Sequence, residues 1–404
     1  MIEKTLAELT LNITDGKHGD CRGKDNSGFY FISCKDVRDG QIHYEDARQI
    51  IEEDFWDTHK RTRLEPEDIL VTNSGTIGRM AFIRDVPLTY RTTFQKSVAI
   101  VKPDKSKIFP KYLYYQLQNC VDGFVNQSNG AAQKNLLLST MRAFKMNIHE
   151  DEDTQIRIAS ILSVYDDLIE NNQKQIKLLE EAAQRLYTEW FVDLRFPGHE
   201  TTPITDGIPE GWKKDRADAF FNMSIGKTPP RAEKQWFTDG GNGTPWISIS
   251  DMGNYGTYVF DTAEALTVEA ISKHNVKVVP SDTVLVSFKL TVGRVSITTT
   301  DTCTNEAIAH FLISNSMLRE YTYLYLKCFE YDSLGNTSAI SKAVNSKIIK
   351  GMPFVMPDNA TITQFHKIAK PIFDAIKDKQ SMNMKLAEAR DRLLPKLMNG
   401  EIEV

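Results

Sequence analysis

Hydrophobic residues recur at heptad spacing in two long stretches of this chain. Intervals of four and three residues alternate along each stretch, which is the pattern of a helix face that packs against another helix. The pattern predicts two long helices, over residues 151–194 and 359–404. The seam of the first helix contains Ile158, Leu162, Tyr165, Ile169, Asn172, Ile176, Leu179, Ala183 and Leu186. The seam of the second contains Phe365, Ile368, Ile372, Ala375, Met382, Leu386, Ala389 and Leu393, with an interruption at Lys379.

The charges of the two predicted helices favour pairing with each other. Residues 151–200 carry 11 acidic and 5 basic side chains, whereas residues 359–404 carry 6 acidic and 8 basic ones. Self-pairing of the first helix would bring like charges together, and pairing with the second helix avoids this. Asn172 is a polar residue in an apolar seam, a position that often sets the register of a coiled coil. We therefore predict an antiparallel pair; two separate amphipathic helices, each lying on its own domain, are the alternative.

Outside these helices, the chain contains a repeated pattern of short strands. The run ILVT at residues 69–72 and the run VLVS at residues 284–287 are β-branched and apolar, which predicts buried strands. They lie 215 residues apart, and Gly78-Arg79 and Gly293-Arg294 follow them at the same offset. Ordered matches of this kind predict two diverged copies of one domain.

The domain organisation follows from the repeat and the helices. The first domain is predicted at residues 1–150 and the second at residues 213–358, each a mixed α/β domain. Residues 195–212 contain three prolines and three glycines and are interpreted as a linker. The expected fold class is α+β: two similar domains separated by an antiparallel coiled coil of residues 151–194 and 359–404, with pseudo-twofold symmetry.

The composition narrows the class of protein further. The chain has 404 residues, a formal net charge of −5 and 41% hydrophobic residues, which is typical of a soluble globular protein and excludes a uniformly basic coat. It contains no run of 18 apolar residues that could span a membrane, and its beginning does not resemble a secretory signal. Its five cysteines are far apart and form no CxxC pair. We therefore expect a cytoplasmic protein without disulfides or a zinc site.

A search for catalytic motifs finds none. The chain has no phosphate-binding loop of the GxxxxGK[ST] type, no GxGxxG after a strand, no HExxH and no GxSxG. The acidic run Glu150–Asp153 is interpreted as the start of a helix, where carboxylates favour the positive end of the helix dipole. His59 and His274 occupy equivalent positions in the two copies and are interpreted as structural residues. We expect no catalytic residue, no metal site and no cofactor in this chain.

Two similar domains on a helical spacer suit a target that repeats along an axis, and duplex DNA with two half-sites is the leading candidate. Arginine can donate two hydrogen bonds to guanine, whereas lysine more often contacts phosphate. The candidates in the first copy are Lys17, His18, Lys24, Arg61, Arg63, Arg79, Arg91, Gln133 and Lys134. Those in the second are Lys227, Arg231, Lys234, Lys289, Arg294 and Lys342. For each of them, a solvated surface charge is the alternative.

The comparison of the copies refines this expectation. Arg79 and Arg294 follow the same glycine turn, which favours a shared role over sequence reading. Residues that distinguish one DNA sequence from another should differ between the copies. Because most surface positions do differ, we predict an asymmetric site with two unlike halves.

Several segments resemble one known family when they are taken in order. RLYTEWFVDLRFPG at Arg185–Gly198 resembles the central region of specificity (S) subunits of type I restriction–modification systems, and ARDRLLPKLMNGEIEV at Ala389–Val404 resembles their C-terminal end. IPEGWKK at Ile208–Lys214 is similar to the start of a second target recognition domain. GKTPP at Gly226–Pro230 and TPWISISDM at Thr244–Met252 are similar to motifs within such domains.

This resemblance implies a non-catalytic subunit. Each target recognition domain would read one half of a bipartite double-stranded DNA site, and the coiled coil would set the spacer. Two modification subunits, which methylate adenine with S-adenosylmethionine, would dock on it, and two restriction subunits that use ATP and Mg would complete a restricting complex. Trp190 and Phe191 are candidate partner contacts, with core packing as the alternative. A protein-binding scaffold with two repeat domains is the alternative function.

Overall fold

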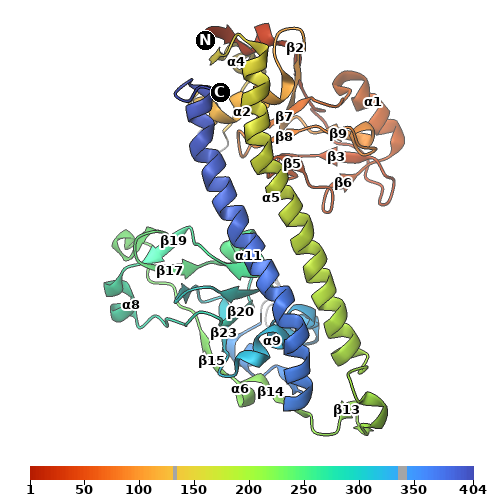
Figure 1. Ribbon diagram of the computed structural model, residues 1–404, viewed down its shortest axis with the longest axis vertical. Coiled ribbons are helices and arrows are strands. Elements are labelled where there is room, and N and C mark those ends of the chain that lie inside the picture. The colour runs from red at the N-terminus through yellow and green to blue at the C-terminus, as the bar shows by residue number, and fades with distance from the viewer. Residues whose placement is uncertain (131–133, 335–343) are drawn as a thin grey trace. The chain divides into compact units, whose positions relative to one another are not determined.

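The computed structural model describes residues 1–130, 134–334 and 344–404 (Figure 1). The chain divides into two compact units. Unit 1 consists of Met1–Leu168 and Leu386–Val404, and unit 2 of Ile169–Lys385. The long helices α5 (Glu152–Tyr187) and α11 (Asn359–Met398) each contribute a segment to both units. A short π-helical turn, Thr188–Val192, follows α5 directly. Each unit therefore contains one globular domain and part of both helices.

The globular domain of unit 1 contains an antiparallel four-stranded sheet in the order β2-β10-β7-β8. Its strands are Thr10–Asp15 (β2), Val98–Pro103 (β10), Ile69–Thr72 (β7) and Met80–Phe82 (β8). A three-stranded sheet, β6-β3-β9, contains Arg48–Gln49 (β6), Tyr30–Ile32 (β3) and Thr92–Phe94 (β9). All four residues of β7 are buried, as its apolar run predicts.

Smaller elements complete unit 1. Strands β1 and β11 pair with each other, as do β4 and β5. The strands are Ile2–Thr5 (β1), Lys145–Ile148 (β11), Val37–Arg38 (β4) and Gln41–Ile42 (β5). The helices are Glu52–Thr62 (α1), Pro110–Asn119 (α2), Val121–Asn126 (α3) and Leu138–Ala143 (α4). The largest core cluster of the unit joins β2, β7, β10 and α2 to Ile158 and Leu162 of α5 and to Leu397 of α11.

Unit 2 has a similar arrangement, with one more strand in each of the two sheets. Its main sheet has the order β15-β23-β20-β21-β18, and a second sheet has the order β16-β19-β17-β22. The first contains Asn222–Ile225 (β15), Ile308–Leu312 (β23), Val284–Ser287 (β20), Val295–Thr298 (β21) and Tyr258–Val259 (β18). The second contains Phe237–Asp239 (β16), Glu264–Leu266 (β19), Thr244–Ile247 (β17) and Cys303–Thr304 (β22).

The remaining elements of unit 2 are short. Paired strands are Ile204–Thr205 (β12) with Ile208–Pro209 (β13), and Lys213–Arg216 (β14) with Pro353–Met356 (β24). The helices are Ala217–Phe220 (α6), Ile249–Tyr255 (α7), Val268–His274 (α8), Arg319–Cys328 (α9) and Ser346–Lys350 (α10).

The two domains match in register as well as in strand order. Leu70 of β7 lies opposite Ile100, and its counterpart Leu285 of β20 lies opposite His310. The loop after β3 and the loop after β17 are also held in the same way. Ser33 Oγ donates to Asp36 Oδ2 over 2.7 Å, and Ser248 Oγ donates to Asp251 Oδ2 over the same distance. The predicted duplication of one mixed α/β domain is therefore confirmed.

Helices α5 and α11 are paired within each unit. In unit 2, Asn172 Nδ2 donates to Asn383 Oδ1 over 2.9 Å. In unit 1, Arg390 Nη1 donates to Asp166 Oδ1 over 2.7 Å. The helices are antiparallel, since a later residue of α5 meets an earlier residue of α11. The predicted coiled coil of two long helices is thus present, and Asn172 is buried within it.

The seam of α5 follows the predicted residues, whereas that of α11 partly differs. The α5 residues Ile158, Leu162, Tyr165, Ile169, Asn172, Ile176, Leu179 and Leu186 are all buried or half-buried. On α11, Phe365 is buried, and Ile372, Leu386 and Leu393 are half-buried. Ile368 and Met382 are 47% and 52% exposed, so their assignment to the seam is wrong.

Two features explain the difference on α11: near Ile368 the helix packs into the core of its own unit, and further along it contacts α5 through polar residues. Ala369, Phe373 and Ile376 are buried there instead of Ile368. Further along, Asn383 and Arg390 make the contacts to α5. A prediction from apolar spacing omits such polar positions and assigns their apolar neighbours to the seam instead.

Candidate nucleic-acid interface

The same turn connects β7 to β8 and β20 to β21. In the first, the Thr72 hydroxyl accepts a hydrogen bond from the backbone N–H of Arg79 over 2.9 Å and donates to the carbonyl oxygen of Thr76. In the second, the Ser287 hydroxyl accepts from Arg294 N–H over 3.0 Å and donates to the carbonyl oxygen of Thr291. We call these two loops, residues 72–79 and 287–294, the twin turns.

A glycine in the left-handed region closes each twin turn. Gly78 has φ 88° and Gly293 has φ 86°, a conformation that other residues adopt at a cost. Each glycine N–H donates over 2.9 Å to the carbonyl oxygen of the residue that begins the turn, Thr72 or Ser287. The predicted tight turn after the strand is therefore present in both copies.

A second matched pair of loops follows β2 and β15. The backbone N–H of Lys17 donates to Phe94, and that of Lys227 donates to Thr304, over 2.8 and 2.9 Å. The preceding residues, Gly16 and Gly226, lie so close to the opposite strand that a Cβ would meet atoms at 2.1 and 2.0 Å. The two candidate lysines therefore occupy equivalent positions, and the glycines before them allow the close approach.

In unit 1, a polar hollow lies beside the twin turn. Its volume is about 420 Å³, and its lining residues are Asp15, His18, Asn73, Ser74, Lys96, Asn135 and Leu136–Leu138. Asp15 ends β2, is 7% exposed and accepts a hydrogen bond from His18 Nε2 over 3.0 Å. Arg61 donates to the other carboxylate oxygen. One buried carboxylate thus brings together two of the candidate residues, His18 and Arg61, which are 43 positions apart in the sequence.

The other candidates of unit 1 are spread over the domain. Lys17 Nζ lies 3.4 Å from Asp57, and Arg63 Nε lies 3.2 Å from Glu65. The Arg91 guanidinium lies 5.8 Å from the centre of the Phe29 ring. Lys24, Arg79 and Lys134 are exposed, and their side chains make no hydrogen bond or ion pair among the described residues. Gln133 lies outside the described residues.

In unit 2, two candidate arginines have structural contacts. Arg231 lies over the rings of Phe237 and Trp246, at 4.3 and 4.5 Å, and donates to both carboxylate oxygens of Glu264. Arg294 Nη1 donates over 2.6 Å to the carbonyl oxygen of Ile249, at the start of α7. Arg294 and Arg79 therefore share a backbone position, but their side chains have different surroundings.

The candidate lysines of unit 2 make fewer contacts than its candidate arginines. Lys289 Nζ lies 5.5 Å from the centre of the Phe288 ring. Lys227 and Lys234 are exposed, without a hydrogen bond or ion pair from the side chain within the part of the chain that the structure describes. Lys342 lies outside that part.

Of three histidines in the domains, His310 is buried and His59 and His274 are half-buried. His310 is 0% exposed; it shares hydrogen bonds of 2.7 Å with Ser224 and Thr304, and burial lowers its pKa to about 4. His59 and His274 pack against aromatic rings, Phe55 at 5.0 Å and Trp236 at 5.2 Å. Burial also lowers the pKa of His59. These contacts are those of structural residues.

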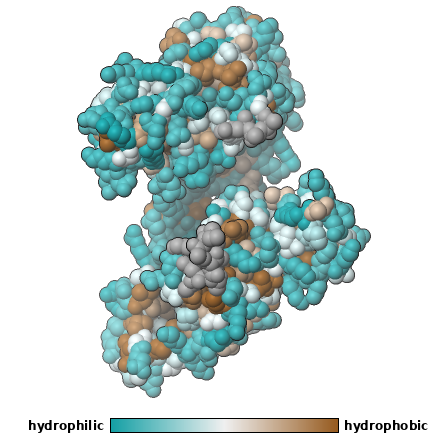
Figure 2. Space-filling model, turned by 180° about the vertical axis from the view of Figure 1, so that it is seen from behind, coloured by the Kyte–Doolittle hydropathy of each residue, from teal (hydrophilic) through white to brown (hydrophobic). Residues whose placement is uncertain are grey.

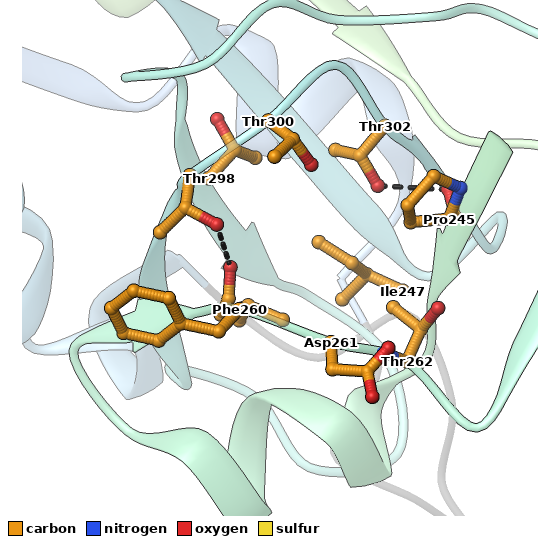
Figure 3. A pocket seen from close by; sticks show the side chains of 10 residues that line it. Pro245, Ile247, Phe260, Asp261, Thr262, Thr298, Thr300 and Thr302 are labelled. Carbon is orange, nitrogen blue, oxygen red and sulfur yellow. Dashed lines mark hydrogen bonds between the residues drawn. The ribbon is translucent and has the colours of Figure 1, made fainter. Parts of the chain in front are cut away.

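A smaller hollow in unit 2 is lined by threonines (Figure 3). Its volume of about 10 Å³ holds at most a single water. The Thr302 hydroxyl donates to the carbonyl oxygen of Pro245 over 2.8 Å, and the Thr299 hydroxyl donates to that of Val259 over 2.7 Å. These hydroxyls therefore tie the walls of the hollow together.

Trp190 and Phe191 pack within unit 2. Trp190 is 6% exposed and belongs to the core cluster of the unit. The Phe191 ring lies 4.6 Å from Tyr321 and 4.9 Å from Phe365, measured between ring centres. This is the core packing that the sequence left open as an alternative, and a contact with a partner stays a prediction.

The described residues contain no group of three or more His, Cys, Asp or Glu side chains that could hold a metal ion. No helix in the described ranges is long and apolar enough to cross a membrane. The surface seen in Figure 2 is mostly hydrophilic, with smaller hydrophobic patches.

Sequence reasoning missed Asp15, Asn73, Ser74 and Asn135 because they are not basic, and it also missed the basic residue Lys96. A usable signal did exist for two of them. Asn73 and Ser74 lie inside the gap-free repeat, at positions where the second copy has Phe288 and Lys289. A difference inside an otherwise matched segment points to a position that serves each copy differently.

Comparisons with known proteins agree on one family. The model of the family described as type I restriction modification DNA specificity domain matches residues 20–181 and 209–386. The specificity subunit of the type I restriction enzyme HindI from Haemophilus influenzae is 24% identical over 370 residues, which cover 75% of this chain and 80% of that protein. The MjaIX specificity subunit from Methanocaldococcus jannaschii is 26% identical over 352 residues, covering 83% and 78%.

A solved structure agrees on the fold. The crystal structure of the S subunit of a type I restriction–modification system from M. genitalium has a TM-score of 0.57 to this chain, at 13% sequence identity. The match covers 98% of this chain and 96% of that one.

Proposed function

The chain belongs to the type I restriction modification DNA specificity domain family, and we propose that it is the specificity subunit of a type I restriction–modification enzyme. Each of its two recognition domains binds one half of an asymmetric bipartite site in double-stranded DNA. The observation that carries this proposal is the pair of twin turns: the backbone is held by the same hydrogen bonds in both domains, while the side chains that it presents differ.

In this proposal, helices α5 and α11 set the spacer between the half-sites and dock two modification subunits, which are adenine methyltransferases. S-adenosylmethionine belongs to those partners, and ATP and Mg belong to two restriction subunits in complexes that cleave DNA. The chain itself supplies sequence recognition. Lys24, Arg79, Lys134, Lys227 and Lys234 support a phosphate-binding role, because they are exposed cations without a partner among the described residues.

The test uses the full chain purified together with its modification subunit. The complex is incubated with a library of randomised duplexes, and the bound or methylated duplexes are sequenced. We expect two unlike short sequences at a fixed separation. A palindromic site would contradict the asymmetry, and the absence of any sequence preference would contradict the proposed function.

The scaffold alternative predicts a different outcome. A scaffold would bind its protein partners in pull-down experiments without retarding duplex DNA in a gel-shift assay at moderate salt. The mostly hydrophilic surface suits either function, so the gel shift with the partner complex separates them.

A further inference from the structure

The twin turns differ at three consecutive positions within a matched frame. Residues 73–75 are Asn-Ser-Gly and residues 288–290 are Phe-Lys-Leu, whereas the turns around them begin with a hydroxyl residue and end with Gly-Arg in both copies. We call these residues the variable triplets. A second segment holds the first residue of each triplet in the same way: Leu136 N–H donates to Asn73, and Val344 N–H donates to Phe288, over 2.8 and 3.1 Å. The frame therefore keeps its geometry while the triplet changes.

In unit 2, the variable triplet ends in an exposed leucine with unfavourable backbone geometry. Leu290 has φ 61° and is 80% exposed. Its counterpart Gly75 has φ 81°, which costs glycine little. A leucine in the left-handed region carries a steric penalty, and an exposed leucine contributes no burial in return. Neither property helps unit 2 to fold, so we look for the role of Leu290 outside the domain.

A charged residue stands next to Leu290 in the chain. Lys289, directly before it, is half-buried. Burial raises the pKa of the Glu306 carboxyl, but the hydrogen bond from Thr228 and the nearby charge of Lys289 contribute to holding it below its usual value. The exposed leucine thus directly follows a lysine whose charge acts on the Glu306 carboxylate.

In unit 1, the notable residue of the triplet is its first one, which is polar and buried. Asn73 is 4% exposed, and its Oδ1 has no hydrogen-bond partner among the residues that the structure describes. It lines the hollow of about 420 Å³, together with His18, Ser74 and Lys96. Buried amide oxygens are normally paired, because an unpaired one loses its bond to water. The unpaired oxygen beside an open polar hollow therefore points to a ligand group that donates a hydrogen bond.

We propose that the variable triplets are specificity-determining segments of the two recognition domains, an inference that rests on the proposed function. Leu290 makes an apolar contact with a base edge, for which the methyl group of thymine is the matching group in the major groove. The Asn73 amide hydrogen-bonds a base edge, for which adenine, with its N6 donor and N7 acceptor, is the matching base. The two halves of the site are then read by opposite chemistry on one backbone frame.

The experiment compares variants of the full chain, each in complex with the modification subunit, on the randomised duplex library. Leu290→Gly gives unit 2 the residue of unit 1 and relieves the backbone strain. Leu290→Asn introduces a polar residue that tolerates the left-handed region. Asn73→Ala and Asn73→Asp are the variants of unit 1. Val268→Ala is the matched control, because Val268 is 78% exposed in the same domain as Leu290 and lies outside the triplet.

The expected result is a loss of discrimination at one or two base pairs of one half-site, by about tenfold, while the other half-site keeps its sequence. The Leu290 variants affect one half, the Asn73 variants affect the other, and Val268→Ala affects neither. Circular dichroism shows that each variant is folded. Unchanged preferences in folded Leu290 variants overturn the inference, as does an equal loss of affinity for all sequences. If the unaltered complex enriches no sequence at all, the proposed function itself fails.

Discussion

Some equivalent residues of the two domains have the same backbone position, but their side chains make different contacts. Arg79 and Arg294 follow the same glycine turn, yet Arg294 holds α7 while Arg79 is exposed. Ile100 and His310 occupy the same register, and only the second needs two hydrogen-bond partners. Equivalent positions of the duplicated domain therefore separate the backbone contacts that both copies share from the side-chain contacts that differ between them.

Lys134 is expected to contact a DNA phosphate. It is exposed, and its side chain has no hydrogen bond or ion pair among the described residues. Replacing Lys134 by Ala should weaken binding to all sequences alike and reduce the slope of log K against log salt concentration by about one. Titrations of labelled duplex at several salt concentrations measure this. Lys145→Ala is the control, because Lys145 already pairs with Glu3 over 2.7 Å. A changed preferred sequence with an unaltered salt slope would contradict the phosphate role.

His310 should make unit 2 sensitive to acid. Its pKa is lowered by burial from 6.5 to about 4, so the unfolded chain takes up a proton at a higher pH than the folded one. The folded state therefore loses stability as the pH falls from about 6.5 to about 4, by roughly 2 kcal/mol between pH 7 and pH 5. Urea unfolding at both pH values measures the loss. In His310→Gln the difference between the two pH values should shrink by that amount, and an unchanged difference would show that other groups cause it.

At the scale of elements, local sequence patterns predicted strands β7 and β20 and the first long helix, α5. The apolar runs at β7 and β20 and the seam of α5 are read directly, because burial there requires nothing but apolar residues. The inner face of α11 could not be predicted, since Asn383 and Arg390 become suitable there only through Asn172 and Asp166 on the other helix. The polar hollow of unit 1 escaped prediction for the same reason: Asp15 and Asn73 are brought together by the sheet and not by spacing.

The asparagine pair between α5 and α11 should be coupled energetically. Asn172 is 6% exposed, so Asn172→Leu leaves the Asn383 amide facing an apolar group and should destabilise the chain by about 1–3 kcal/mol. The double variant with Asn383→Leu should recover most of this loss, because no polar group is then left unpaired. Urea unfolding of the two single variants and the double variant gives the coupling energy. Additive losses would indicate that the two side chains do not depend on each other.

At the scale of the whole molecule, the shared backbone of the twin turns allows the two domains to present different side chains. A triplet can change in one domain without disturbing the sheet that carries it, because the side-chain hydroxyl of Thr72 or Ser287 accepts the backbone N–H of Arg79 or Arg294 and holds the turn in both copies. Since the domains are separate compact units, a change in one leaves the core of the other intact. If the proposed function holds, one half of the DNA target can then change while the other stays the same.

If the paired helices set the spacer, their length should control it. Inserting one heptad into α5 beside Asn172 and a matching heptad into α11 beside Asn383 preserves the seam and lengthens both helices by about 10.5 Å, at 1.5 Å per residue. At 3.4 Å per base pair, the preferred spacer should grow by up to about three base pairs, while both half-site sequences stay the same. Sequencing of duplexes enriched from the randomised library measures both. A heptad inserted into α5 alone is the control, since it shifts the register and should abolish binding to the bipartite site. An unchanged spacer in the doubly extended, folded protein would show that the helices do not measure the distance.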